Sequence, residues 1–460
     1  MTLIKSISGI RGTIGGLSGT ALTPPDIISF ASAYGAWVME QAAPQNGKRY
    51  RLIVGRDARI SGMVVDALVC NTLLCLGIDV INAGLATTPT VEMAVTMEDA
   101  DGGIILTASH NPKQWNALKL LNAKGEFLSG EDGVRILELT GASDIEYASV
   151  DNLGQLENKD FLNRHIQSIL DLELVQAALV KKSGFKVVVD AVNSVGGIAI
   201  PAMLKALGVS EIIPLNCDPT GEFAHNPEPL PEHLHEIRDA VVKHKADLGV
   251  IVDPDVDRLA LVNPDGSFFG EEYTLVAVSD YILSNNKGAT VSNLSSSRAL
   301  RDLTRKHKCE YAASAVGEVN VVEKMKSLRA VIGGEGNGGI IYPELHYGRD
   351  ALVGIALFLS HMAISKKSAL ELRSEYPVYY MSKNKIQLTE GKDPDDVLSQ
   401  VLARYENNDP ITIDGVKIDF EDSWVHLRKS NTEPIIRIYS EAKSADEAET
   451  LAKRFMKEMS

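Results

Sequence analysis

The feature that most constrains the fold of this chain is an alternation of apolar strands and helices that recurs three times. The first run is predicted to contain a strand at 51–54, a helix at 63–76, a strand at 78–84, a helix at 89–97 and a strand from Gly102. The second runs from a strand at 185–190 through a helix at 231–244 to a strand at 248–252, and the third from 289–293 to 330–332. Right-handed crossovers in such βαβ units bring strand ends to one edge of each sheet.

The fold class that follows is α/β, with three successive mixed domains and a fourth domain of another kind. After about Tyr376 short strands and two helices, at 395–405 and from Ala445, indicate a small α+β domain. A length of 460 residues also exceeds what a single core supports. The predicted domains are 1–155, 156–264, 265–372 and 373–460.

The last strand of the first run leads into the segment TASHNP at 107–112. Ser109 stands where the chain leaves the predicted sheet, so we expect its hydroxyl to point into solvent at the edge where such sheets bind ligands. Asn111 and Pro112 mark a turn. An ordinary loop that contains a serine explains these residues equally well.

The last strand of the second run is followed by Asp253, Asp255, Asp257 and Arg258. In an extended segment this spacing places the three carboxylates on one side, where their hard oxygens suit Mg²⁺. An EF-hand loop is excluded, because Arg258 and Pro264 replace the glycine and glutamate that it needs. The alternative is a solvated acidic turn, in which the like charges repel one another unless a cation is present.

Two later loops carry groups that suit a phosphate and a sugar. Residues 428–434, RKSNTEP, combine a fixed cation with hydroxyls, an amide and backbone N–H groups, and another arginine follows. The candidate phosphate ligands are Arg428, Ser430, Asn431, Thr432 and Arg437. Residues 333–339, GGEGNGG, offer Glu335 and Asn337 on a backbone that we expect to be very flexible. An ordinary hairpin turn and an unliganded glycine turn are the alternatives.

Composition restricts the partners and the compartment. A formal charge of −15 argues against nucleic acid and anionic membranes as partners. Four cysteines without a CxxC pair favour a reduced, cytoplasmic compartment, and the N-terminal segment lacks the apolar stretch of a signal peptide. The longest apolar run, 351–364, is too short to span a bilayer.

Taken in order along the chain, these four loops resemble the signature loops of the α-D-phosphohexomutases, the family of phosphoglucomutase, phosphomannomutase and phosphoglucosamine mutase. The resemblance implies four domains around a central cleft, with the sheets of the first three sandwiched by helices. It also implies that Ser109 carries a phosphoryl group, and that a phosphate oxygen on it joins the three aspartates as a ligand of Mg²⁺. Arg258 would then neutralise the moving phosphoryl group, Arg11 and Lys119 match basic positions of the active site, and His110 would orient the loop. Glu335 and Asn337 would bind sugar hydroxyls.

The implied reaction interconverts hexose 1-phosphate and 6-phosphate through a sugar 1,6-bisphosphate, in a monomer or homodimer. The segments GGEGNGG and HYGRDA favour glucosamine phosphate as the substrate, with glucose or mannose phosphate as the alternative. Ala117, Gly339 and Glu318 depart from residues common in the family, which leaves the general base open. A Mg²⁺-dependent phosphatase with a phosphoserine intermediate and a non-catalytic sugar-phosphate sensor are the alternatives from other classes.

Overall fold

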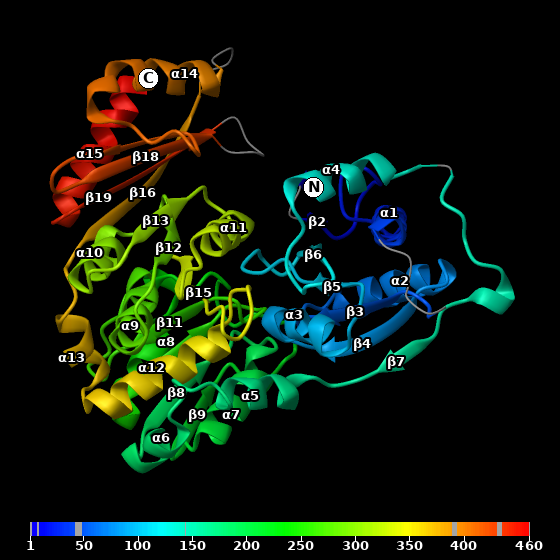
Figure 1. The fold of residues 1–460 in the computed structure, drawn as a ribbon, viewed down its shortest axis with the longest axis horizontal. Coiled ribbons are helices and arrows are strands. Elements are labelled where there is room, and N and C mark those ends of the chain that lie inside the picture. Colours follow the sequence, from blue (N-terminus) through cyan, green and yellow to red (C-terminus); the bar gives the residue numbers. More distant parts are fainter. Residues whose placement is uncertain are drawn as a thin grey trace. The chain divides into compact units, whose positions relative to one another are not determined.

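The computed structural model describes residues 2–6, 9–41, 48–142, 144–388, 393–429 and 435–459 (Figure 1). Internal contacts divide the chain into two compact units. The first comprises Met1–Gly270 and Gly339–Glu371, and the second comprises Glu271–Gly338 and Leu372–Ser460. Within the described ranges, every helix is too short or too polar to cross a membrane.

The first unit begins with a seven-stranded sheet in the order β1-β2-β6-β5-β3-β4-β7. Its elements are β1 (Leu3–Ser6), β2 (Gly9–Thr13), α1 (Pro24–Gln41), β3 (Arg51–Arg56), α2 (Gly62–Cys75), β4 (Asp79–Leu85), α3 (Thr88–Met97), β5 (Gly102–Leu106), β6 (Trp115–Leu121), α4 (Gly130–Leu139), η2 (Val150–Asn152) and β7 (Leu156–Asn158). Strands β4, β3 and β5 are parallel, and β6 returns antiparallel to β5.

Helices cover both faces of this sheet. Alternate side chains of its central strands point to opposite faces, so each face has apolar side chains for helices to pack on. Leu52 and Val54 of β3 pack with residues of α1, α2 and α4. Ile53, between them, packs with residues of α3. Burial on both faces explains why these strands are apolar throughout. The predicted sheet sandwiched by helices is confirmed for this part of the chain.

The rest of the first unit contains a four-stranded sheet in the order β11-β10-β8-β9. The helices and strands of this remaining part of the chain, of which β15 lies outside that sheet, are α5 (Leu162–Leu170), α6 (Ala177–Ser183), β8 (Lys186–Asp190), α7 (Gly196–Leu207), β9 (Glu211–Leu215), η3 (Pro231–His233), α8 (His235–His244), β10 (Leu248–Val252), β11 (Leu259–Val262), β15 (Gly339–Ile341) and α12 (Ala351–Ser365). The single helix predicted at 231–244 is wrong, because Leu234 has a non-helical backbone between η3 and α8. The side chain of Leu234 is buried in the core that α8 forms with the sheet.

The second unit has two sheets. Its elements are α9 (Glu271–Asn285), β12 (Thr290–Asn293), α10 (Arg298–Lys306), β13 (Tyr311–Ser314), α11 (Glu318–Leu328), β14 (Ile332–Glu335), β16 (Tyr380–Gln387), α14 (Pro394–Arg404), η4 (Glu406–Asn408), β17 (Val416–Asp419), β18 (Trp424–Lys429), β19 (Ile435–Ala442) and α15 (Ala445–Met459), and α13 (Ala369–Ser374) spans the boundary between the units. Strand β12 pairs in parallel with β13 and β14. The C-terminal sheet, β16-β19-β18-β17, is antiparallel and packs on α14 and α15.

The threefold repeat predicted from the sequence is confirmed by strand order. In each of the three sheets the first parallel strand lies between the second and the third, as β4-β3-β5, β9-β8-β10 and β13-β12-β14. The polar loops after β5, β10 and β14 therefore leave equivalent strands. The bounds predicted for the third of these strands, 330–332, are wrong. Strand β14 extends from Ile332 to Glu335 and so includes part of the glycine-rich segment.

Candidate active site

Ser109 lies in a turn three residues beyond the end of β5, and its side chain is directed at a carboxylate. Its backbone has a φ of +47°, a left-handed conformation that is strained for a residue with a Cβ. Its Oγ donates a hydrogen bond of 2.7 Å to Asp253 Oδ2. The expectation that this hydroxyl points into solvent is wrong, because the aspartate segment covers it and leaves Ser109 only 8% exposed.

The three aspartates converge, although the chain there is not extended as predicted. Residues 253–257 form a tight turn after β10, in which Val256 has a φ of +65°. One carboxylate oxygen from each of Asp253, Asp255 and Asp257 lies within 4.8 Å of the others, and all three residues are buried. The turn brings the carboxylates together where a straight strand would have spaced them along one side.

Cations from other elements hold part of this acid cluster. Lys119 of β6 donates from Nζ to Asp255 Oδ2 at 2.7 Å and lies 3.5 Å from Asp257 Oδ2, and Arg349 donates to Asp257 Oδ2 at 2.6 Å. The other oxygens, Asp255 Oδ1 and Asp257 Oδ1, are buried without a hydrogen-bond partner in the described part of the chain. Buried anionic oxygens without donors are costly, and a bound cation would satisfy them.

The pKa values of two carboxylates of the cluster are shifted in opposite directions. Burial and the negative charges of Asp257 and Asp255 raise the pKa of Asp253 well above its ordinary value. Burial alone would also raise the pKa of Asp255, but Lys119 holds it below its ordinary value. The cluster therefore carries electrostatic repulsion that is concentrated on Asp253, the residue in contact with Ser109.

The remaining basic residues predicted for this site lie around the same two turns. Arg258 donates its backbone N–H to Asp253 Oδ1, and its guanidinium makes ion pairs of 3.9 Å with Glu228 and Asp257. Its buried Nε has no hydrogen-bond partner among the residues described. Burial lowers the pKa of His110 to about 2, with Arg258 and Arg11 adding positive charge nearby, so His110 is neutral and lies 3.4 Å from Ser109 Oγ.

A buried arginine that the sequence analysis missed holds the serine turn. The Arg59 guanidinium donates to the carbonyls of Ser109, Asn111, Pro112 and Trp115, and its Nε donates to Asp57 Oδ2 at 3.0 Å. Arg59 is 1% exposed, so its guanidinium has no access to water as a substitute for these carbonyls. The planar, five-donor fork of arginine is therefore what fixes the backbone of Ser109.

We expect Arg59→Lys to lower the free energy of unfolding by about 3 kcal/mol, because one ammonium cannot reach all the carbonyls that Arg59 satisfies. Urea denaturation measures this change. The matched control is Arg51→Lys at the other end of β3, where the side chain is exposed and no loss is expected. Equal stability of the two variants would show that Arg59 does not organise the turn.

Thr88 and Arg349 are also part of the site and were not predicted. Thr88 Oγ1 donates to Asp255 Oδ2 at 2.6 Å from the N-terminus of α3. Arg349 lies just before α12, more than 90 residues along the chain from Asp257. The acid–base pair Asp57 and Arg59, directly after an apolar strand, was a usable signal. Arg349 lies in the segment HYGRDA, which the sequence singles out without giving Arg349 a role, and nothing local in the sequence points to Thr88.

In the second unit, Glu335 ends β14 and is buried rather than displayed on a flexible loop. Its Oε1 accepts hydrogen bonds from Asn293 at 2.7 Å and from the Gly317 backbone at 3.2 Å. Gly333 is required for packing, since a Cβ there would lie 2.4 Å from the Met325 sulfur. The prediction of a very flexible backbone is therefore wrong for residues 333–335, which belong to β14. Asn337, beyond the strand, is half-buried.

The predicted phosphate loop joins β18 and β19. Arg428 and Arg437 lie directly opposite each other on these strands, and Arg428 Nε is 3.4 Å from Asp414 Oδ2. Like charges directly opposite on a sheet repel each other, and this arrangement suits an anion. Ser430, Asn431 and Thr432 lie outside the described residues. Glu318 and Gly339, the departures from the family pattern, begin α11 and β15.

A buried histidine on β18, His426, gives the second unit a predicted pH dependence. His426 Nδ1 lies 2.9 Å from Ser295 Oγ, its Nε2 lies 2.7 Å from the Asp414 carbonyl, and burial lowers its pKa to about 4. The unfolded chain binds a proton near the ordinary value of 6.5, so it holds more protons between these two values. The free energy of unfolding should therefore fall as the pH drops from 6.5 to about 4, by up to about 1.4 kcal/mol per pH unit.

Urea denaturation at a series of pH values tests this, with His426→Gln as the comparison. The variant should show a flatter dependence over that window, because glutamine does not titrate. All other groups are shared, so parallel curves for the two proteins would mean that His426 does not contribute.

The sequence matches four protein-family profiles in order. They are described as the phosphoglucomutase/phosphomannomutase alpha/beta/alpha domain I at residues 3–144, domain II at 163–266, domain III at 270–379, and the C-terminal domain at 385–458. Together these matches extend over nearly the whole chain.

Whole-chain comparisons agree with these profiles. A phosphoglucomutase/phosphomannomutase of Thermococcus kodakarensis is 36% identical over 444 residues, which cover 95% of either chain. A phosphoglucosamine/phosphogalactosamine mutase of Sulfurisphaera tokodaii is 32% identical over 458 residues, 98% of this chain and 97% of that one. The crystal structure of a phosphoglucomutase/phosphomannomutase family protein from Burkholderia thailandensis superposes with a TM-score of 0.85 at 25% identity, over 99% of this chain and 97% of that one.

Proposed function

The chain belongs to the phosphoglucomutase/phosphomannomutase family, and from this premise we propose which residues carry its reaction and which sugar it takes. As a phosphohexomutase it interconverts hexose 1-phosphates and 6-phosphates. The observation that carries the assignment of the site is the 2.7 Å contact between Ser109 Oγ and Asp253 Oδ2 within a buried cluster of three aspartates.

The metal of the site is proposed to be Mg²⁺, held by Asp253, Asp255 and Asp257 together with an oxygen on Ser109. The donor set consists of hard oxygens, and two of these, Asp255 Oδ1 and Asp257 Oδ1, are buried without donors in the described ranges. When bound, Mg²⁺ would supply positive charge that offsets the negative charge of a transferred phosphoryl group.

In the proposed reaction Ser109 carries a phosphoryl group on Oγ and passes it to the free hydroxyl of a sugar monophosphate. The bond from phosphorus to Ser109 Oγ breaks and a bond from phosphorus to the sugar oxygen forms. The proton that the sugar hydroxyl loses ends on Ser109 Oγ, which is restored as a hydroxyl. The resulting 1,6-bisphosphate then reorients in the site, and its other phosphoryl group is transferred to Ser109. The product is the isomeric monophosphate, with no net hydrolysis.

The cations around Ser109 have separate roles in this proposal. Arg258, whose guanidinium makes only long ion pairs within the described chain, is available to the phosphoryl oxygens. Lys119 holds the acid cluster in place. Arg11 and the neutral His110 complete the surroundings of the serine turn. Positioning and fixed charge of this kind account for most of the catalysis in phosphoryl transfer.

The non-reacting phosphate of the substrate is proposed to bind Arg428, Ser430, Asn431, Thr432 and Arg437, and the sugar hydroxyls to bind Glu335 and Asn337. The opposed arginines of β18 and β19 support the first assignment. The position of Glu335 at the end of β14, the equivalent of the strands before Ser109 and Asp253, supports the second.

We propose glucosamine phosphate as the preferred substrate, on the segments GGEGNGG and HYGRDA and on the relative from Sulfurisphaera tokodaii, whose name specifies amino sugars. Glucose or mannose phosphate is the second candidate, favoured by the relative at 36% identity. A coupled assay with the 6-phosphates of glucosamine, glucose and mannose, each with its bisphosphate, decides between them. The highest kcat/KM should be for glucosamine 6-phosphate, and release of inorganic phosphate instead would identify a phosphatase.

A further inference from the structure

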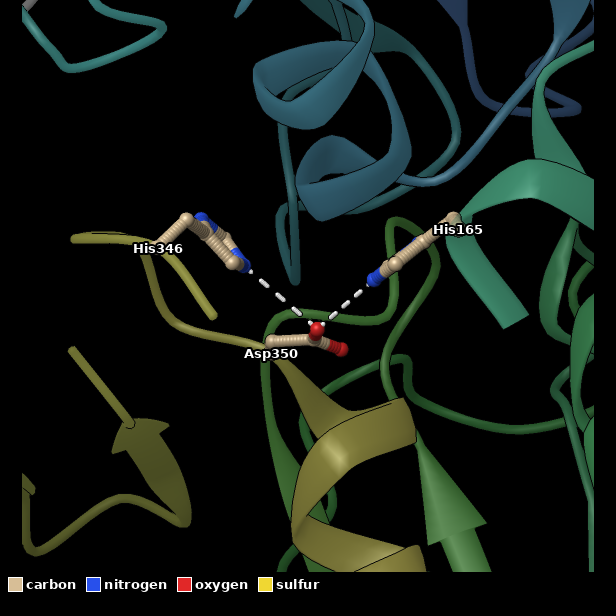
Figure 2. Close-up of side chains that lie close together, drawn as sticks. All are labelled: His165, His346 and Asp350. Carbon is tan, nitrogen blue, oxygen red and sulfur yellow. Dashed lines mark hydrogen bonds and ion pairs between the residues drawn. The ribbon is translucent and has the colours of Figure 1, made fainter. Parts of the chain in front are cut away.

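A second group of ligand-type side chains lies in the first unit, apart from the aspartate cluster (Figure 2). It consists of His165 from α5, and of His346 and Asp350 from the segment that precedes α12. His165 Nε2 lies 2.9 Å from Asp350 Oδ2, and His346 Nε2 lies 3.4 Å from the same oxygen. Both imidazoles therefore direct the same ring nitrogen toward one carboxylate oxygen.

The spacing of these atoms fits a small coordination sphere. The three ligand atoms lie within 4.8 Å of one another. Ligands about 2.0–2.1 Å from a tetrahedral ion lie roughly 3.3 Å apart, so the two measured separations are close to those of a loaded site. The other oxygen of Asp350 is engaged elsewhere, since it accepts from the Leu352 and Val353 backbones at the start of α12. Asp350 thus offers a single, fixed oxygen.

The outward ring nitrogens have partners of the kind found behind metal-bound histidines. His165 Nδ1 lies 3.0 Å from Thr90 Oγ1, and His346 Nδ1 lies 3.4 Å from Glu92 Oε2. If each Nδ1 carries the proton and faces its neighbouring oxygen, each Nε2 presents a lone pair toward the shared carboxylate oxygen. A carboxylate behind the imidazole, as Glu92 is behind His346, also makes the ring a stronger ligand.

Burial and charge also favour a cation here. His165 and Asp350 are fully buried and Glu92 is 1% exposed, so two carboxylates are withdrawn from water beside two imidazoles. A divalent ion would balance both charges without requiring either ring to be protonated. The side chain of His346 is 13% exposed, which leaves a route from solvent to the site.

We propose that His165, His346 and Asp350 bind one divalent transition-metal ion of the type that prefers imidazole, represented by Zn²⁺, at a site separate from the Mg²⁺ of the aspartate cluster. Two nitrogens and one carboxylate oxygen suit Zn²⁺, whereas the aspartate cluster offers oxygen alone. The ion would fix the start of α12 and with it Arg349, the neighbour of Asp350 that donates to Asp257.

Titration of the metal-stripped full chain with Co²⁺, in an excess of Mg²⁺, tests the proposal. Co²⁺ bound to imidazole in a four-coordinate site absorbs visible light strongly, whereas Co²⁺ surrounded by six oxygens is pale. We expect a single equivalent to develop strong bands that Zn²⁺ abolishes and further Mg²⁺ does not. Wild-type protein that binds no Co²⁺ with such bands would overturn the proposal without any variant.

Variants locate the ion. In His346→Ala and His346→Gln the affinity for Co²⁺ should fall by more than about 10-fold, a loss already typical of removing an outer partner. His307→Ala, which removes a histidine paired with Asp280 elsewhere, should leave binding unchanged, and so should Asp253→Asn, which removes a competing ligand of the other cluster. Thermal denaturation confirms that each variant is folded. Unchanged Co²⁺ binding in the folded His346 variants, or loss in Asp253→Asn, would contradict the proposed ligands.

Discussion

Replacing Ser109 with alanine is expected to abolish mutase turnover, with a fall in kcat of about 10⁴-fold or more, because the oxygen that carries the phosphoryl group is removed. Binding of Mg²⁺ should persist, since the three aspartates remain. A coupled assay measures the first effect and calorimetry the second. The separation of the two effects is what distinguishes loss of the nucleophile from loss of the site.

The control for this variant is Ser183→Ala at the end of α6, where the hydroxyl donates to a carbonyl of its own helix. Its activity should equal that of the wild type. The variant should remain folded, because Ser109 contributes one hydrogen bond to a carboxylate that also accepts from the Arg258 backbone. Activity in Ser109→Ala close to that of the control would end the assignment of Ser109.

Asp253→Asn is expected to separate activity from stability. Three buried carboxylates within 4.8 Å repel one another in the metal-free chain, and burial with the charges of Asp257 and Asp255 raises the pKa of Asp253. A carboxyl whose pKa is raised on folding loses stability as the pH rises above its unfolded value, so at neutral pH the charge of Asp253 is unfavourable. The uncharged variant should be at least as stable as the metal-free wild type, and its kcat should fall about 10³-fold or more.

Thermal denaturation with and without Mg²⁺ checks this prediction. The wild type should gain about 2–3 kcal/mol at Mg²⁺ concentrations near 100 times the dissociation constant, and the variant should gain little. Asp265→Asn, in the exposed turn after β11, is the control and should keep both the activity and the response to Mg²⁺. A metal-free variant several kcal/mol less stable than the wild type would show that Asp253 acts as a structural anchor.

The succession of strands and helices along the chain and the positions of the polar loops could be predicted from the sequence, because they depend on local patterns. Apolar segments separated by helical segments identify β3, β4 and β5 and their two repeats, and the loops with Ser109 and Asp253 follow directly. That these two loops meet could not be derived from the pattern, since they leave different sheets. The resemblance to a family supplied that expectation.

What could not be predicted depends on long-range packing. The extended conformation expected for residues 253–257 was wrong because Val256 adopts a left-handed turn, which no residue type there requires. The solvent exposure expected for Ser109 was wrong because a segment more than 140 residues away covers it. Arg349 reaches Asp257 from before α12, and its role follows only from the packing of that helix in the first unit.

The central claim is that Ser109, beside the aspartate cluster, receives and passes on a phosphoryl group. Incubation of the protein with a radiolabelled sugar 1,6-bisphosphate and Mg²⁺, followed by peptide mapping, tests it most directly. We predict label on Ser109 that unlabelled sugar monophosphate removes as labelled bisphosphate. Label on another residue, or label released only as inorganic phosphate, would contradict the claim.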